Sequence, residues 1–572
     1  MNFKMDFKDL NIEYSDIKYL AFLTIFSCLL VSFMIDFNLK LGIYCSDVLI
    51  YLTNSMRFAG VNLGLSSNMY LSPVICFLSS ILIRLGLGGE LSIYIVTGIF
   101  AVIGNIGLYI LLKTRFDSLL SLTGSVLFAS FSLNVLWLAN GTLDIPAVAL
   151  SVWAIYFALL AFKNSRFFIL AILIWVLAVF TRYTAILVLA FMVLYYLFEK
   201  DFIGKVDLLL YDKKSFKVHL IEYIKSEEFR NIIIGIIISV ALIFIFLLVI
   251  HFSGSKLTFL TQGSSIASGA KGQVIDKAYT TDTFFYVHEF LNFLFANKVI
   301  FNDKIPVLIG ASPLAYLVGL IFILGFLIKG LSLFGSFKLD DNNYHLNLFN
   351  KRNLTLFSIV ALILIGISFK FTAVLSIVLL LVLCLLLYGI FKNHEFASLN
   401  LLFLAWFLSY FIFFTFLDIK VNRYIITALP AFVYFLILAL DSLLDYCIGL
   451  NLSKSLKTGV WKVIPIILIL FAVFSAFTFA GTVEIDESIK APELMADYLI
   501  DYDENYTSSQ VAVYNVRYYD WLLKMKTIPL PDERINVLDS SNITYYISDN
   551  EFNLSNYTMI HKENNLYLYK HN

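Results

Sequence analysis

The sequence predicts a polytopic α-helical membrane protein with about 13 transmembrane helices and a small C-terminal α/β domain outside the membrane. Three observations support this fold class. Of the 572 residues, 60% are hydrophobic and 14% are charged, whereas soluble domains average about 45–50% apolar and about 25% charged residues. The hydrophobic residues form repeated charge-free runs, and runs of about 18 residues or more are typical of membrane spans. After residue 484 the pattern changes to short mixed segments.

The N-terminal part of the chain sets the expected topology. Residues 1–18 are charged and are placed in the cytoplasm, and the first span is expected at 19–35. The apolar segment 71–87 contains Arg84 and is shorter than the roughly 20 residues of a span, so we expect it to lie in the membrane interface. The cytoplasmic segments then hold more Lys and Arg than the external loops before the C-terminal domain. This agrees with the preference of cationic residues for the cytoplasmic side. The N-terminus is therefore predicted to be cytoplasmic and the C-terminal domain extracytoplasmic, in a multi-pass protein of the cell membrane.

The remaining spans follow the charge-free runs. Residues 166–199 are too long for one span and have basic residues at both ends, so a helical hairpin with Arg182 at its outer tip is expected. A basic loop is expected at 199–230 and a long polar external segment at 251–304. Single spans are predicted at 91–112, 118–143, 145–162, 231–250, 305–328, 354–369, 371–391, 396–417, 424–440 and 463–483.

The chain is expected to divide into a membrane domain at 1–483 and a C-terminal α/β domain at 484–572. In the second part, strand-like runs alternate with helix-like runs. The net charge of zero gives no reason to expect a nucleic-acid partner. Five cysteines show no metal-ligand spacing. Cys45 and Cys76 fall in one compartment, where they could pair, but two unpaired apolar cysteines are the simpler interpretation.

Ionisable side chains at the external membrane face are the candidate functional residues. Asp47 and Asp144 lie beside charge-free runs, and charges at such positions are costly and often functional. The alternative is that both cap helix N-termini. Arg182 and Arg423, at the external ends of spans, could bind a phosphate bidentately or simply extend to the lipid headgroups.

The order of these pieces resembles the GT-C glycosyltransferases, in particular the group of dolichyl-phosphate-mannose protein mannosyltransferases and aminoarabinose transferases. That group has an acidic motif after the first span, then a proline segment, two short loop motifs and a late Arg-Tyr. The corresponding residues here are Ser46-Asp47-Val48 with Tyr51, Leu71-Ser72-Pro73-Val74, Leu143-Asp144-Ile145-Pro146, Phe180-Thr181-Arg182-Tyr183-Thr184, and Arg423-Tyr424 with Pro430. Val48 replaces the second acid of the family motif and Ser72 a lysine of some members, which argues against metal binding and lysine–phosphate contact there.

The resemblance implies a membrane glycosyltransferase that moves a sugar from a polyprenyl- or dolichyl-phosphate donor to an acceptor hydroxyl on the external face, with inversion. The acceptor could be a protein, a glycan or a lipid, and the surroundings are membrane lipids. No cofactor is predicted, although a divalent metal is left open. Asp47 is the expected base and Asp144 orients substrate. The other implied site residues are Arg423, Arg182 and Lys420 for the donor phosphate, and Tyr51, Arg57, Tyr183 and Tyr424 for substrate positioning.

Two other functions fit part of the sequence. A transporter or flippase could use Asp47 and Asp144 to bind substrate or protons, but it predicts internal repeats, and none is visible. A membrane scaffold that presents the C-terminal domain predicts that both aspartates can be replaced without loss.

Overall fold

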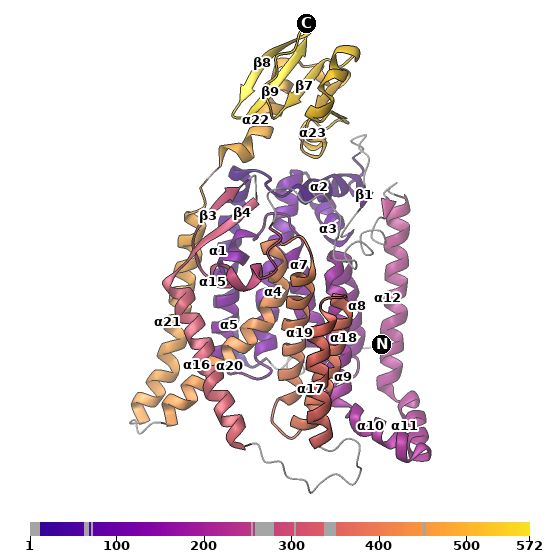
Figure 1. Cartoon of the computed structure of the whole chain (residues 1–572), viewed down its shortest axis with the longest axis vertical. Coiled ribbons are helices and arrows are strands. Elements are labelled where there is room, and N and C mark those ends of the chain that lie inside the picture. Colours follow the sequence, from indigo (N-terminus) through magenta and orange to yellow (C-terminus); the bar gives the residue numbers. More distant parts are fainter. Residues whose placement is uncertain are drawn as a thin grey trace.

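The protein consists of a helical bundle that carries a sheet domain at one end (Figure 1). The computed structural model describes residues 12–61, 68–69, 73–252, 256–257, 280–302, 305–336, 351–449, 454–484 and 486–572. The predicted fold class, a polytopic helical membrane protein with a small C-terminal α/β domain, is confirmed.

Among the described residues, nine helices are long and apolar enough to cross a membrane. They are α1 (Ile17–Leu41), α4 (Gly89–Leu112), α12 (Glu227–Phe252), α16 (Pro313–Ser336), α17 (Lys351–Ser368), α18 (Ala373–Phe391), α19 (Ala397–Phe416), α20 (Leu429–Gly449) with the preceding 3-10 helix η4 (Asn422–Ala428), and α21 (Lys454–Gly481). Four shorter apolar helices lie in the same bundle: α5 (Ser118–Ser130), α7 (Asp144–Leu160), α8 (Phe167–Thr181) and α9 (Ile186–Glu199). By length the described residues thus give nine spans, fewer than the expected number of about 13; the four shorter helices correspond to the runs expected to cross at 118–143, 145–162 and 166–199.

The predicted hairpin at 166–199 is present. It consists of α8 and α9, with Arg182 and the short helix η3 (Tyr183–Ala185) between them. Arg182 ends α8 in an extended conformation, and its backbone N–H still donates to the Ala178 carbonyl at 2.8 Å. This turn directs the guanidinium into the protein.

The predicted span at 118–143 is wrong as a continuous helix. Asp117 caps α5 by accepting from the backbone N–H groups of Leu119 and Leu120, but α5 ends at Ser130 and is followed by the short α6 (Ser132–Leu136). The chain then forms a buried loop in which Asn140 accepts from the Thr142 backbone at 3.0 Å. Gly141 has φ +85°, and a Cβ there would lie 2.7 Å from Val48. Glycine at this position therefore lets the loop before α7 pack on the helix α2 (Ser46–Phe58).

Two further expectations differ from the structure. Residues 305–311 do not begin a span but form strand β4 (Ile305–Ala311), which pairs antiparallel with β3 (Ala296–Asn302) before α16 begins at Pro313. The basic loop at 199–230 contains two helices, α10 (Phe202–Tyr211) and α11 (Lys213–Lys225). Asp201 and Asp212 cap their N-termini through side-chain hydrogen bonds. Both helices lie at the end of the bundle opposite the sheet domain (Figure 1).

The apolar segment 71–87 contains the helix α3 (Pro73–Arg84), while residues 71 and 72 lie outside the described residues. Figure 1 shows α2 and α3 at the end of the bundle next to the sheet domain. The Arg84 guanidinium donates to the Phe58 carbonyl at 2.6 Å, which ties α3 back to the end of α2. A helix of 12 residues is too short to cross a membrane.

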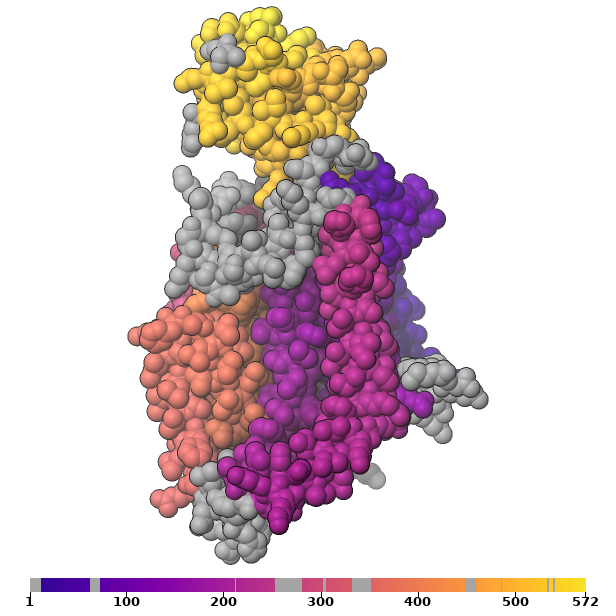
Figure 2. All heavy atoms as spheres, turned by 90° about the vertical axis from the view of Figure 1, so that its right-hand side faces the viewer, coloured from indigo at the N-terminus to yellow at the C-terminus, as the bar shows by residue number. Residues whose placement is uncertain are grey.

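The predicted external segment 251–304 is described only in part. Strand β2 (Lys256–Leu257) pairs with β1 (Asn68–Met69), and residues 280–302 include α14 (Phe285–His288) and α15 (Phe290–Leu294). Most of 253–279 lies outside the described residues. On the face seen in Figure 2, α12 forms a separate ridge, and Gly235 allows it to approach α8 closely, because a Cβ there would lie 3.1 Å from the Ile169 backbone.

The C-terminal domain is a five-stranded mixed sheet with helices. Its elements are α22 (Glu487–Tyr502), η5 (Tyr506–Ser508), β5 (Val511–Val513), α23 (Val516–Leu522), β6 (Ile528–Pro529), η6 (Asp532–Ser540), β7 (Tyr545–Ser548), β8 (Tyr557–Glu563) and β9 (Leu566–His571). The strand order is β6-β5-β7-β9-β8, with β5 parallel to both its neighbours. Val511 and Val513 pack in the core shared with α22 and α23, whereas Ala512 packs in a second core, as alternation along a strand requires.

Candidate active site

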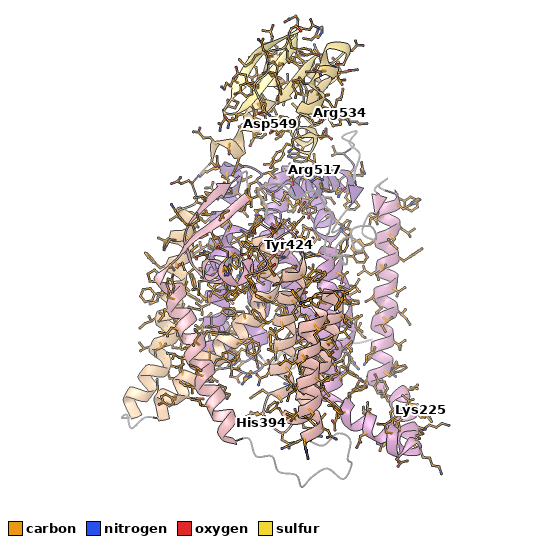
Figure 3. The ribbon with its side chains drawn as sticks, in the orientation of Figure 1. Lys225, His394, Tyr424, Arg517, Arg534 and Asp549 are labelled. Atoms are coloured by element: carbon orange, nitrogen blue, oxygen red, sulfur yellow. The ribbon has the colours of Figure 1, made fainter. Side chains whose placement is uncertain are left out.

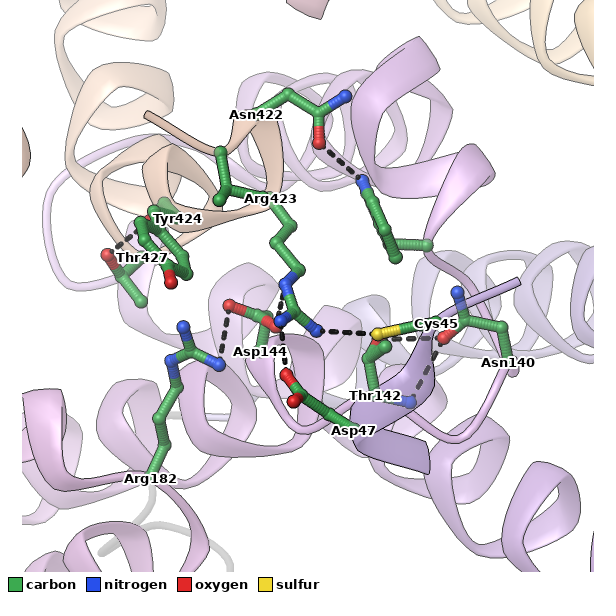
Figure 4. A network of polar contacts seen from close by, with 12 residues as sticks. Cys45, Asp47, Asn140, Thr142, Asp144, Arg182, Asn422, Arg423, Tyr424 and Thr427 are labelled. Atoms are coloured by element: carbon green, nitrogen blue, oxygen red, sulfur yellow. Dashed lines mark hydrogen bonds and ion pairs between the residues drawn. The ribbon is translucent and has the colours of Figure 1, made fainter. Parts of the chain in front are cut away.

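Four charged side chains form a chain of ion pairs (Figure 4), one of them on α2, which lies next to the sheet domain in Figure 1. Arg182 Nη1 lies 3.0 Å from Asp144 Oδ1, and Asp144 Oδ2 lies 3.9 Å from Arg423 Nε. Arg423 Nη2 lies 2.5 Å from Asp47 Oδ2. The fold thus brings together four predicted site residues from α2, α7, the α8–α9 turn and η4.

The two ends of this chain differ in solvent access. The Asp144 side chain is 0% exposed, whereas the Asp47 side chain is 34% exposed. Both guanidinium groups are nearly buried. Asp47 is therefore the carboxylate that a substrate can reach, and Asp144 is the one that holds the two arginines.

Neither aspartate caps its helix, so the alternative of a simple capping role is wrong. The N-cap of α2 is Cys45, and the N-cap of α7 is Leu143. Asp47 lies in the first turn of α2, where the helix dipole favours a negative charge. Cys45 contributes differently, because its Sγ accepts a hydrogen bond from Arg423 Nη1 at 3.2 Å. Cys45 and Cys76 are both free thiols.

The loops before α2 and α7 are fixed to each other. The Tyr44 hydroxyl donates to the Leu136 carbonyl at 2.8 Å and accepts from the Asn140 amide at 2.6 Å. Asp47 and Asp144 each follow one of these loops by a few residues, so the two bonds join the segments that carry the two carboxylates.

The residues that position Arg423 could not be identified from the sequence. The neighbouring Asn422 accepts from the Trp137 indole at 3.1 Å and donates to the Pro306 carbonyl at 2.8 Å. The Arg423 guanidinium lies 5.5 Å from the Trp137 ring. The predicted Tyr424 lies between the two arginines, at 5.1 Å from Arg182 and 6.0 Å from Arg423. Trp137 and Asn422 are 285 positions apart, and no local pattern connects them.

The other predicted residues have varied positions. Tyr51 is buried one helical turn after Asp47, and Tyr183 is half-buried beside Arg182. Arg57 lies in the last turn of α2, outside the ion-pair chain. The Lys420 ammonium donates to the carbonyls of Thr415, at 2.8 Å, and Leu417 at the end of α19, so it is engaged away from the arginines.

The electrostatics keep Asp47 ionised. Burial raises the pKa of this carboxyl, but Arg423 beside it, with smaller effects from Arg182 and Arg517, brings the pKa below its ordinary value. Burial raises the pKa of the Cys45 thiol despite the same arginine, so the thiol stays protonated at neutral pH. The four ion-pair residues together carry no net charge.

The donor set does not favour a metal. The part of the chain that the structure describes contains no group of three or more His, Cys, Asp or Glu residues placed to hold an ion. Both carboxylates of the site already face guanidinium groups. A groove of about 660 Å³ lies elsewhere, at the far end of the bundle between α1, α5 and α21, and is separate from this site.

Comparisons with known proteins agree with the fold. Residues 71–209 match the family model of the dolichyl-phosphate-mannose-protein mannosyltransferases. ArnT from Cupriavidus metallidurans bound to undecaprenyl phosphate superposes with a TM-score of 0.54 at 11% identity, covering 96% of this chain and 98% of that chain. The same protein in the apo state gives 0.51 at 10% identity, with 96% and 97% covered. The oligosaccharyltransferase AglB from Archaeoglobus fulgidus scores lower, 0.47 at 13% identity, with 94% and 69% covered. No curated protein sequence matches.

Fold and site together define a polytopic membrane protein in which charged side chains from distant helices meet beneath a C-terminal sheet domain. Over residues 71–209 the family-model match agrees with the resemblance seen in the sequence, and the chain as a whole shares the fold of ArnT.

Proposed function

We propose that the protein transfers a sugar from a polyprenyl- or dolichyl-phosphate donor to an acceptor hydroxyl on the extracytoplasmic face of the cell membrane, with inversion at the anomeric carbon. The observation that carries the proposal is the open end of the ion-pair chain. There a partly exposed carboxylate, Asp47, lies beside a guanidinium, Arg423. This pair offers a proton acceptor and a phosphate-binding cation within one site.

In the proposed reaction, the acceptor oxygen forms a bond to the anomeric carbon while the bond from that carbon to the phosphate oxygen breaks. Asp47 accepts the hydroxyl proton. The lipid phosphate leaves with the electron pair, and Arg423 and Arg182 stabilise its added negative charge. The lowered pKa of Asp47 in the empty site keeps its carboxyl ionised before the donor binds.

The remaining residues have supporting roles in this proposal. Asp144 is fully buried and contacts both arginines, so it acts through them as a positioning residue. Tyr424, between the arginines, and Tyr51, one turn after Asp47, are placed to orient the substrate, as is Tyr183 beside Arg182. Lys420 and Arg57 lie outside the ion-pair chain, which makes them weaker candidates for substrate contact.

Two observations support the external placement. The site lies at the same end of the bundle as the C-terminal domain, and α10 and α11 with their lysines lie at the other end (Figure 1). Cationic segments favour the cytoplasmic side. A lipid-phosphate donor is consistent with the undecaprenyl phosphate bound by the structurally similar ArnT. The acceptor class stays open among protein, glycan and lipid.

The test is transfer of radiolabelled sugar by the purified protein in lipid nanodiscs from a panel of prenyl-phosphate sugars, each offered with peptide, glycan and lipid acceptors. We expect transfer from at least one donor, with an anomeric configuration opposite to that of the donor. Accumulation of labelled donor inside sealed vesicles, with no transfer to any acceptor, would support the flippase alternative and overturn the proposal.

A further inference from the structure

The ion-pair chain alone lacks the charge that the proposed donor requires. Its two arginines are balanced by its two aspartates. A lipid-phosphate sugar brings one negative charge, and the departing phosphate gains a second when the bond to the sugar breaks. We call the partly exposed end of the chain, at Asp47, the mouth of the site. Additional positive charge there would favour both donor binding and departure of the phosphate.

The C-terminal domain is firmly seated next to this mouth. The Tyr518 hydroxyl on α23 donates to the Ile43 carbonyl at 2.9 Å, four residues before Asp47. The Trp521 indole donates to Glu90 Oε1 at 3.1 Å. The Trp521 ring lies on the backbone of Gly89, where a Cβ would be only 2.8 Å away. These three contacts fix α23 against the helices that surround the site.

Arg517 immediately precedes Tyr518 on this seated helix. Its side chain is exposed, and Figure 3 shows it in the space between the sheet domain and α2. It belongs to no ion pair recorded among the described residues. Its charge is near enough to Asp47 to lower the pKa of that carboxyl.

Three other cations near this end are already engaged. Arg84 donates to the carbonyls of Phe58 and Ala59, and the Lys420 ammonium donates to carbonyls at the end of α19. The Lys524 ammonium lies on the Trp521 ring, 3.0 Å from its centroid. Besides the two arginines of the ion-pair chain, Arg517 is the cation whose charge acts on Asp47.

We propose that Arg517 of the C-terminal domain completes a phosphate-binding subsite with Arg423, and that it holds the phosphate of the lipid-linked donor and of the lipid product. The inference rests on the proposed function and deepens it. The soluble domain is then part of the binding site for the lipid phosphate, and its docking on α2 is a requirement for tight donor binding.

The experiment compares Arg517→Gln, Arg517→Lys and Arg534→Gln in nanodiscs. Arg534 is an exposed arginine of the same domain, farther from the bundle in Figure 3, and serves as the matched control. The readouts are the donor KM and inhibition of sugar transfer by unlabelled polyprenyl phosphate, which lacks the sugar. We expect Arg517→Gln to raise both the donor KM and the inhibition constant of polyprenyl phosphate by roughly 5- to 20-fold, as the loss of one partly solvated charged contact predicts. We expect Arg534→Gln to change neither.

Two comparisons separate charge from packing. Arg517→Lys should restore most of the affinity at low salt, and the wild-type affinity should fall more steeply with ionic strength than that of Arg517→Gln. Equal inhibition constants for Arg517→Gln and Arg534→Gln would overturn the inference, as would a loss that Arg517→Lys does not restore at any salt concentration. A wild-type protein that transfers no sugar would instead reject the proposed function itself.

Discussion

Replacement of Asp47 by asparagine is the sharpest test of the proposed chemistry. Asparagine keeps the shape of the side chain, and its Oδ1 can still accept from the Arg423 Nη2 that now lies 2.5 Å from the carboxylate. It cannot accept the hydroxyl proton. The substitution therefore removes the base while it leaves the surrounding geometry nearly unchanged.

The expected loss is large in rate and small in stability. Loss of a general base costs roughly 10²- to 10⁴-fold in turnover, which corresponds to about 3–5 kcal/mol of activation free energy. The free energy of unfolding should fall by much less than the roughly 3–5 kcal/mol that breaking a buried ion pair costs. The reason is that the Asp47 side chain is 34% exposed, so solvent screens the charge left on Arg423.

The assay is single-turnover transfer of radiolabelled sugar by the purified variant, together with donor binding and thermal unfolding. Asp36→Asn is the matched control, because Asp36 is an exposed aspartate whose ion-pair partner is Lys40 on its own helix. The control should keep wild-type turnover. Near wild-type transfer by a well-folded Asp47→Asn protein would falsify the assignment of Asp47 as the base.

Four further predictions follow from the same geometry. Asp144→Asn removes the negative charge that faces the buried Arg182 guanidinium at 3.0 Å and should lower the free energy of unfolding by roughly 3–5 kcal/mol; thermal unfolding in detergent measures this, and an unchanged midpoint contradicts it. Arg423→Lys keeps the charge but loses the bidentate geometry, so the donor affinity should stay below that of wild type, whereas an unchanged donor KM in Arg423→Ala would remove Arg423 from the phosphate site. The pKa of Asp47 is lowered in the free enzyme, so kcat/KM for the donor should fall only below about pH 3.9, the ordinary aspartate value. The fall of kcat in acid, which reports the donor complex, should occur at a higher pH than the fall of kcat/KM. If the two falls occur at the same pH, donor binding leaves the pKa of Asp47 unchanged. Single cysteines at Gly60 and Gly88, in a cysteine-free protein, should both react with an impermeant external reagent, whereas reaction at Gly88 only after permeabilisation would mean that the segment 71–87 crosses the membrane.

Much of the helical architecture could be predicted because a helix that crosses lipid needs about 20 consecutive, mostly apolar residues. The lengths of the charge-free runs predicted helices such as α4 and α18, and they predicted that Arg182 lies between α8 and α9. Errors arose where an apolar run was not one helix. Residues 305–311 are apolar but pair as β4, and Pro313, a typical first residue of a helix, marked the true start of α16. The Asn140-Gly141 pair similarly marked the turn that interrupts 118–143.

The candidate site was predictable only in its residue types. Both aspartates and both arginines could be selected because ionisable groups at a membrane face are costly. Their pairing could not, because it depends on contacts between positions hundreds of residues apart, such as Asp47 with Arg423. The supporting roles of Trp137 and Asn422 depend on the same tertiary packing.

In the proposed mechanism, the unequal burial of the ion-pair chain accounts for a site that is both stable and reactive. Asp144 is fully enclosed and contacts both arginines, so these cations stay in place without substrate. At the other end, Asp47 is partly open and shares Arg423 with whatever anion enters. In the proposed reaction, a donor phosphate at Arg423 would compete with Asp47 for the same guanidinium. Because that guanidinium is the main group that lowers the pKa of Asp47, its transfer to the phosphate would make Asp47 a stronger base when the sugar is in position. On this proposal, donor binding itself releases Asp47 from its ion pair with Arg423.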